Sequence, residues 1–159
     1  MINNNKLHTR SIKRADMKIG LVAGNFDIIH PGYIEMFEDA KKNACNYLVI
    51  ALHDDPTIER PDKCKPVQTV DEREYILRSI KYVDNVVHYN TEDELLDIVK
   101  NFDYDIRIIG SDYLNRNFTG KELEKEIYYH ERKHKYSLTS LKARIATQMN
   151  IQDKNNNNV

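Results

Sequence analysis

The hydrophobic positions of the chain fall into short apolar runs separated by segments with helical spacing. Four runs rich in aliphatic and β-branched residues are expected as buried strands, over residues 17–23, 47–52, 85–89 and 105–109. Between them, apolar residues recur three or four positions apart, which predicts amphipathic helices. Alternating strands and helices are typical of βαβ units. The pattern therefore predicts an α/β fold, a doubly wound parallel sheet with helices on both faces.

Helix starts are marked by polar residues in a repeated pattern. A Thr followed three positions later by Glu can form a capping box, in which each side chain bonds the other residue's amide. This pattern begins at Thr69, Thr91 and Thr119. A final helix is expected over the apolar positions from Leu141 to Met149. Ser137, Thr139 and Ser140 are the candidates for its first residue.

Length and composition indicate one domain without a membrane span. The chain has 159 residues and a formal net charge of −1, so a nucleic acid partner is not expected and an anionic ligand needs a local cationic cluster. We expect a flexible basic arm over residues 1–16, the domain over 17–150 and a disordered Asn-rich tail over 151–159. The polar, basic start is unlike a secretory signal, which predicts a cytoplasmic protein.

The segment after the first predicted strand carries the clearest candidate chemistry. In open α/β sheets, ligands bind beyond the carboxyl ends of the strands. There, Gly24 and Gly32 allow the backbone to approach a ligand, and Gly32 opens a helix whose free amides favour an anion. Neither the G-x-G-x-x-G nor the G-x-x-x-x-G-K-[ST] phosphate motif occurs in the chain. A phosphate would therefore be held in another way.

This segment resembles the first loop of the HIGH-motif nucleotidyltransferase superfamily, cytidylyltransferase-like branch, which reads G-x-F-D-x-x-H-x-G-H. The matching residues are Gly24, Phe26, Asp27, His30 and Gly32. Further family motifs are matched in order along the chain by Lys63, Lys65, Arg73, Leu77, the run from Tyr82 to Asp84, Gly110, Asp112, Arg132, Ser137 and Thr139. The resemblance covers nearly the whole predicted domain and implies a Rossmann-like fold.

The resemblance also implies a reaction. A phosphomonoester oxygen would attack the α-phosphorus of a nucleoside triphosphate, and pyrophosphate would leave. Catalysis then depends mainly on alignment and charge stabilisation, because the attacking phosphate is already ionised.

By the same resemblance, residues can be assigned to subsites. The nucleotide would bind to Gly24, Asn25, Phe26, His30, Gly32, Tyr33, Arg73, Gly110, Asp112, Arg132, Ser137 and Thr139, and the acceptor to Asp27, Lys63 and Lys65. His30, Tyr33, Lys65 and Arg132 would be the catalytic residues. Asp27 has the alternative role of orienting a loop or helix amide. We expect the imidazole of His30 to lie near Lys65, Arg73 and Arg132.

The chain departs from the family pattern at positions that face the ligand in the family. Tyr33 replaces the second histidine of the first motif, and Leu138 replaces a threonine of the last. A tyrosine hydroxyl is a neutral donor, whereas histidine can become a cation beside phosphates. Losing one strong transition-state donor costs about 3–4 kcal/mol. We hypothesise that Tyr33 keeps a hydrogen bond to phosphate. The alternative is a degenerate nucleotide-binding regulatory module without turnover.

The family branch sets the remaining expectations. It favours CTP over ATP as the triphosphate, a small phosphomonoester as the acceptor, Mg²⁺ as the cofactor and a homodimer as the assembly. Four aspartates follow predicted strands and are candidates either for a magnesium ligand or for a turn or cap residue, and none of them can be assigned as a ligand from the sequence: Asp27, Asp54, Asp55 and Asp112. His53, His88, His130 and His134 have no companion at ligand spacing, which argues against a zinc site.

Overall fold

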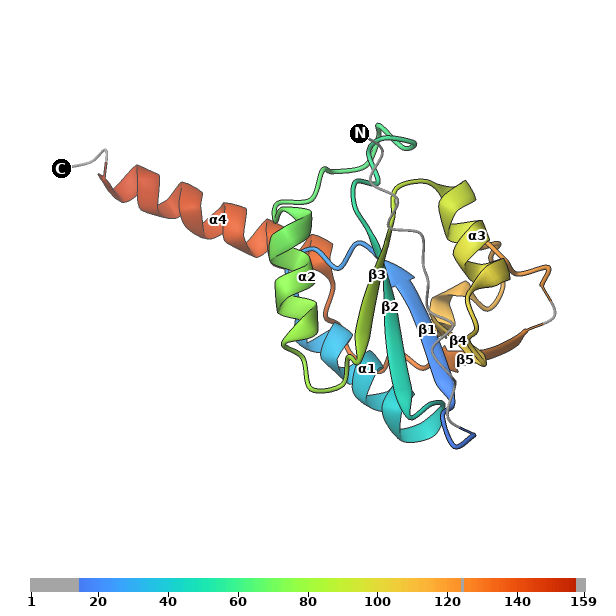
Figure 1. The fold of residues 1–159 in the computed structure, drawn as a ribbon. Coiled ribbons are helices and arrows are strands. Elements are labelled where there is room, and N and C mark those ends of the chain that lie inside the picture. Colours follow the sequence, from blue (N-terminus) through green and yellow to red (C-terminus); the bar gives the residue numbers. More distant parts are fainter. Residues whose placement is uncertain (1–14, 124, 157–159) are drawn as a thin grey trace.

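The protein, described by a computed structural model over residues 15–123 and 125–156, contains one five-stranded sheet. The strands are β1 (Ile19–Gly24), β2 (Tyr47–His53), β3 (Asn85–Tyr89), β4 (Ile106–Gly110) and β5 (Glu126–His130). The helices are α1 (Pro31–Asn43), α2 (Val70–Arg78), α3 (Glu92–Asn101) and α4 (Leu138–Asn156). Across the sheet the order is β3-β2-β1-β4-β5, and all neighbouring strands are parallel (Figure 1). The predicted Rossmann-like, doubly wound fold is confirmed.

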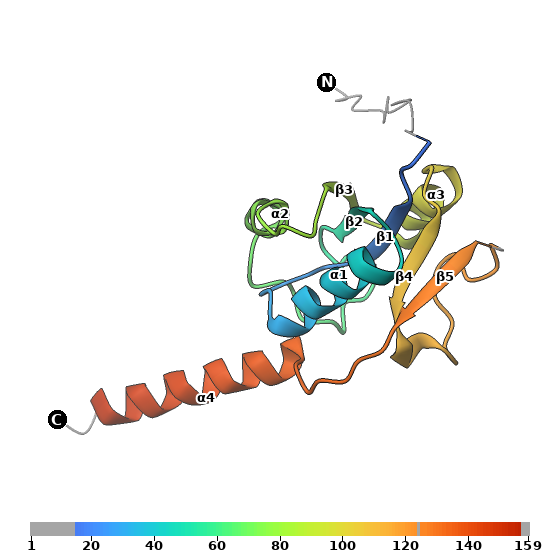
Figure 2. The same cartoon turned by 90° about the horizontal axis from the view of Figure 1, so that it is seen from below.

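Alternation along the central strands divides the core into two layers. On β2, Leu48, Ile50 and Leu52 pack on the face covered by α1 and α2, where Phe37 and Leu77 are fully buried. Val49 and Ala51 point to the other face, where they pack against Leu95, Ile98 and Val99 of α3. Figure 2 shows these helices on opposite sides of the sheet. Burial on both faces explains why the middle of β2, residues 48–52, is apolar at every position.

Two of the three predicted capping patterns start helices. Thr69 and Glu72 form the full reciprocal capping box at the start of α2. Thr91 accepts a hydrogen bond from the Glu94 amide at the start of α3, while the Glu94 carboxylate accepts from the Asn90 amide instead. At α4, the hydroxyl of Ser137 accepts from the Ser140 amide, which identifies Ser137 among the three candidates as the cap.

The structure differs from the prediction at two places after β4. Thr119 does not open a helix, because its hydroxyl donates to the Glu92 carboxylate and the next residues form turns, with Gly120 at a φ of 84°. The fifth strand, β5, was not predicted. It lies at the edge of the sheet, and most of its residues are half-buried and aromatic or charged rather than aliphatic.

The last helix leaves the body of the domain. The first turn of α4 lies against the domain, and the rest projects away (Figures 1 and 2). The helix continues past residue 150 to Asn156, beyond the expected end of the domain. Residues 1–14 of the predicted basic arm lie outside the described residues. No helix in the described part of the chain has the length and apolar character required to cross a bilayer.

Candidate active site

A wide cavity opens where β1 and β4 lie side by side, and it collects segments from across the chain. The connection after β1 leads to β2 on one side, while β4 is followed by β5 on the other, so this is the topological switch point where ligands bind in such sheets. The cavity has a volume of about 1710 Å³. It is lined by the ends of both strands, the start of α1, the segment after β4 and the start of α4.

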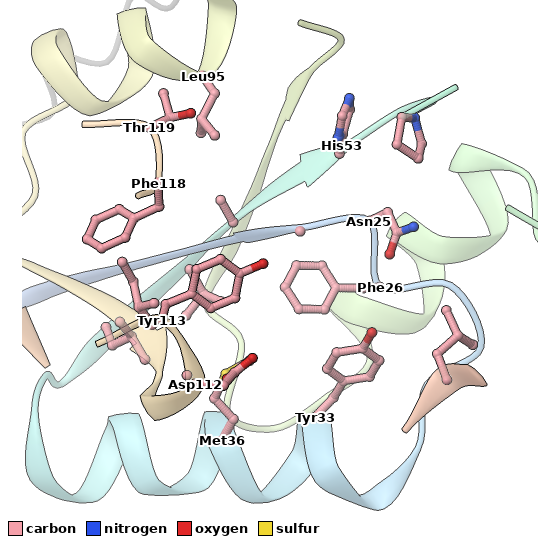
Figure 3. A pocket seen from close by; sticks show the side chains of 18 of the residues that line it. Asn25, Phe26, Tyr33, Met36, His53, Leu95, Asp112, Tyr113, Phe118 and Thr119 are labelled. Atoms are coloured by element: carbon pink, nitrogen blue, oxygen red, sulfur yellow. The ribbon is translucent and has the colours of Figure 1, made fainter. Parts of the chain in front are cut away.

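Aromatic side chains enter this cavity from two segments (Figure 3). Phe26 follows β1 and Tyr33 rises from α1, with their rings 5.2 Å apart in an edge-to-face arrangement. Tyr113 and Phe118 enter from the segment after β4. The cavity therefore offers flat apolar surfaces beside its polar groups, as a site for a nucleoside would require.

The loop between β1 and α1 is held in a strained conformation. Phe26 and Ile28 have φ angles of 47° and 52°, in the left-handed region that non-glycine residues rarely adopt. The β-branched Ile28 is the more costly of the two. Its amide donates to the side chain of Gln68 at 2.9 Å. Such strain persists only where the surroundings fix the backbone, and it is concentrated at functional sites.

Arg73 is one of the groups that fix this loop. Its side chain is 2% exposed and donates to the carbonyls of Asn25 at 2.8 Å, His53 at 2.7 Å, Asp54 at 2.5 Å and Gln68 at 3.2 Å. It does not line the cavity. The expectation that Arg73 binds the triphosphate therefore requires correction. Its guanidinium joins the ends of β1 and β2, and four of its five donors are already used.

Asp27 is a second brace, buried completely beneath the loop. One carboxylate oxygen accepts from the Gln68 amide and the other from the Val67 amide, both at 2.9 Å, and Lys142 of α4 lies 2.7 Å from the second oxygen. Burial alone would raise the pKa of Asp27, but these bonds outweigh it and lower the pKa. With both oxygens occupied, Asp27 orients loop amides, the alternative role, and is not placed to bind an acceptor.

His30 caps α1 with one ring nitrogen. Its Nδ1 accepts from the Gly32 amide at 3.1 Å, so the neutral ring carries its proton on Nε2. The residue is 9% exposed, and it lines the cavity. Burial, and then the neighbouring His134 and Arg132, lower the pKa of His30. The imidazole is therefore a neutral Nε2–H donor at pH 7.

Tyr33 packs beneath His30, not beside it. The two rings are stacked with centroids 4.2 Å apart. Burial raises the pKa of the Tyr33 hydroxyl, so the phenol stays protonated at neutral pH. Tyr33 lines the cavity as a neutral side chain. The hypothesis that its hydroxyl bonds phosphate stays a prediction.

Residues of the last family motif line the cavity beside the start of α1. Arg132 donates to the carbonyl of Tyr136 at 3.1 Å, and its other terminal nitrogen lies 3.7 Å from Asp112. Ser137 and Thr139, at the first turn of α4, line the same wall. Gly110 leaves room for the Asp112 carboxylate, because a Cβ atom at this position would lie 2.5 Å from its Oδ1.

The two predicted acceptor lysines differ in position. Lys63 lines the cavity. The side chain of Lys65 is 78% exposed, lies 3.7 Å from Asp55 and does not line the cavity. Of the three cations expected near His30, only Arg132 shares the cavity with it. The catalytic role assigned to Lys65 finds no support in this placement.

The cavity also contains cationic and polar groups that the sequence did not reveal. Lys142 and His134 line it beside Arg132, and Arg107 of β4 lines the α3 side. Lys142 could have been suspected only from its place one turn after Leu138. His134 could have been suspected only from its place inside the last motif.

The geometry agrees with the comparison with known proteins. The family model described as "Cytidylyltransferase-like" matches residues 21–156. The chain belongs to the cytidylyltransferase-like family. This family is a branch of the HIGH-motif nucleotidyltransferase superfamily, as the resemblance implied.

Similar proteins extend this assignment. Bifunctional protein HldE of Helicobacter pylori strain J99 is 33% identical over 137 residues, covering 85% of this chain and 29% of that protein. Its counterpart from Gluconacetobacter diazotrophicus is 31% identical over 117 residues, covering 72% and 23%. This cytidylyltransferase-like chain thus spans about a quarter of the length of these relatives.

The fold is shared with a solved structure. The lipopolysaccharide core biosynthesis protein of Thermoplasma volcanium matches with a TM-score of 0.53 and 22% identity, covering 83% of this chain and 88% of that one.

Proposed function

We propose that the domain transfers a nucleotidyl group, cytidylyl in preference to adenylyl, from a nucleoside triphosphate to a small phosphomonoester and releases pyrophosphate. The observation that carries this proposal is the convergence of His30, Arg132 and the first turn of α4 on one cavity at the switch point of the sheet. These groups are a neutral donor, a cation and a helix start, all suited to phosphate oxygens.

The chemistry needs alignment and charge stabilisation from these groups. An acceptor phosphate oxygen forms a bond to the α-phosphorus, the bond to the bridging oxygen of the leaving pyrophosphate breaks, and negative charge grows on that oxygen. Nε2–H of His30 would donate a hydrogen bond to the α-phosphate. A neutral donor stabilises the charge there without giving up its proton. Arg132 and the α4 start would hold the β- and γ-phosphates, and Lys63 the acceptor.

Mg²⁺ would enter with the triphosphate. Among the residues that the structure describes, no group of three His, Cys, Asp or Glu side chains could hold a metal ion. The donor set therefore fits a cation that keeps phosphate oxygens and water as most of its ligands, as Mg²⁺ does. Asp112, on the cavity wall beside Arg132, is one of the carboxylates that line the cavity and would face that hydration shell; the others are Glu59, Asp62, Glu92 and Glu122. When bound, the ion would neutralise charge on the triphosphate.

The test is pyrophosphate release from each of CTP, ATP, GTP and UTP with Mg²⁺, against glycerol phosphate, phosphocholine, phosphoethanolamine and sugar phosphates. We expect release with at least one pair, and fastest with CTP. Saturable triphosphate binding without release for every pair would instead favour the regulatory module.

A matched pair of histidine variants tests the role of the site. In His30→Asn the amide oxygen can still cap α1, but the Nε2 donor is lost. We expect kcat to fall by about 10²–10³-fold. His88→Asn, which changes a histidine outside the cavity, should leave kcat unchanged.

A homodimer is proposed on the family branch alone. Light scattering coupled to gel filtration of the full chain tests it, with a mass of twice 18.7 kDa expected. A monomer mass at all concentrations would contradict it.

A further inference from the structure

The position of the second histidine in the first motif is filled by a tyrosine, yet a second imidazole does reach the site. It belongs to His134, in the segment between β5 and α4, and it lies against the backbone of Gly32. A Cβ atom built on Gly32 would be 2.9 Å from Nε2 of His134 and 3.0 Å from Cε1 of His30. The two rings thus flank one glycine, and both line the cavity.

The hydrogen bonds of His134 fix which nitrogen carries its proton. Nδ1 accepts from the Tyr136 amide at 3.2 Å, so a neutral ring carries its hydrogen on Nε2. That Nε2 is fully buried, and no group of the described protein accepts from it. A buried donor without a partner costs about 1–3 kcal/mol. The edge of the ring that carries Nε2 packs against Gly32, so a ligand oxygen in the cavity removes this cost when the ring turns that edge toward it.

The surroundings of this donor indicate an anionic ligand. Arg132, two residues earlier, and the Ser137 cap of α4 line the same wall. His134 and Arg132 both lie close enough to His30 to add to the effect of burial and lower its pKa. Three donors and a helix start therefore surround one volume, and within it the carboxylate of Asp112 lies 3.7 Å from Arg132. A polyphosphate supplies enough negative charge to occupy it.

We propose that His134, in the last motif, is the second phosphate-binding imidazole of this domain. It takes the role of the histidine whose place in the first motif is filled by Tyr33. This inference rests on the proposed function. Its Nε2–H donates to the triphosphate beside the Nε2–H of His30, and Tyr33 serves as the packing base on which the His30 ring is stacked. No bond is made or broken at His134. The residue stabilises the charge that grows on the phosphate oxygens.

Two amide variants separate this role from a structural one. His134→Asn places an oxygen near the position of Nδ1, so the bond to the Tyr136 amide can be kept while the Nε2 donor is lost. His134→Gln places its amide near the position of Nε2, so a donor to the ligand can be kept. We expect kcat to fall by about 10²–10³-fold in His134→Asn and by less in His134→Gln. A purely structural role predicts the reverse order, with the larger loss in His134→Gln.

A rescue variant and a neighbouring control complete the design. Adding Tyr33→His to His134→Asn restores the usual second histidine of the first motif. The double variant should have a kcat at least tenfold higher than that of His134→Asn alone. Lys133→Ala removes an exposed side chain that pairs with Glu131 and should leave kcat within twofold of the wild type. Urea unfolding of each variant confirms that the fold is kept.

The outcomes distinguish this inference from the proposed function. If the wild type turns over and His134→Asn stays within threefold of it, the inference is wrong and the proposed function stands. If the wild type releases no pyrophosphate from any pair, the proposed function fails. The phosphate contact is then decided by a titration with inorganic tripolyphosphate and Mg²⁺, followed by the ¹⁵N shift of His134. A saturable shift of Nε2 supports the contact, and an unchanged shift overturns it.

Discussion

Arg73 offers the sharpest test of how the site is built, because its charge suggests a phosphate ligand while its bonds indicate a brace. Each hydrogen bond to a charged group contributes about 1.5–3 kcal/mol, and a buried carbonyl left without a donor costs about 1–3 kcal/mol. Four carbonyls depend on this one guanidinium. Because bonds that share a group are not additive, we expect Arg73→Met to lower the free energy of unfolding by about 3–5 kcal/mol.

The assay is urea unfolding followed by circular dichroism, with triphosphate titration of the folded variant in dilute buffer. Arg73→Lys should lie between the wild type and Arg73→Met, because three donors on one nitrogen cannot span the same carbonyls. Arg78→Met, an exposed arginine of the same helix, is the control and should cost about 1 kcal/mol or less. If Arg73→Met unfolded within 1 kcal/mol of the wild type but lost triphosphate affinity, Arg73 would be a ligand and the brace would be refuted.

Two other charged sites should show opposite dependences on pH. The lowered pKa of Asp27 contributes stability above its unfolded pKa of about 3.9, and this stability is lost as the pH falls through the lower folded value. Urea unfolding should therefore show that Asp27→Asn is destabilised relative to the wild type at pH 7, and the difference should shrink on acidification. For His88, burial opposes the imidazolium, but hydrogen bonds to Asp54 and Glu74 outweigh this and raise its pKa. Its contribution to folding stability is therefore present below about pH 6.5 and is lost as the pH rises through the folded pKa. His88→Gln should therefore be more destabilising at pH 5.5 than at pH 9 in thermal melts, and an equal loss at both would contradict the ion pairs.

The sequence was sufficient to predict the central strands of the sheet, because these strands are buried on both faces. A run as apolar as residues 47–52 is typical of a strand that is covered on both faces of a parallel sheet. β5 was not predicted because this edge strand, which carries Tyr128 and Tyr129, has no continuous aliphatic run. The capping pattern at Thr119 was misleading, since its hydroxyl bonds Glu92 of α3, a partner that only the tertiary structure provides.

The candidate site was predictable where backbone and motif coincide, as at His30 and Gly32. It was not predictable where one side chain type serves two purposes. A guanidinium binds carbonyl oxygens as readily as phosphate oxygens, so the motif register of Arg73 could not show that four of its five donors are already used. His134 is distant from His30 in sequence, and only the segment after β5 brings the two rings to the same glycine.

The most direct test of the account follows the fate of the two ends of the triphosphate. CTP labelled with ³²P at either the α- or the γ-phosphate is incubated with Mg²⁺, a phosphomonoester and either the wild type or His30→Asn. We predict that the α-label moves to the acceptor and the γ-label appears only in pyrophosphate, with both rates reduced about 10²–10³-fold in the variant. Label appearing as inorganic phosphate, or rates that are equal in the two proteins, would contradict nucleotidyl transfer at this cavity.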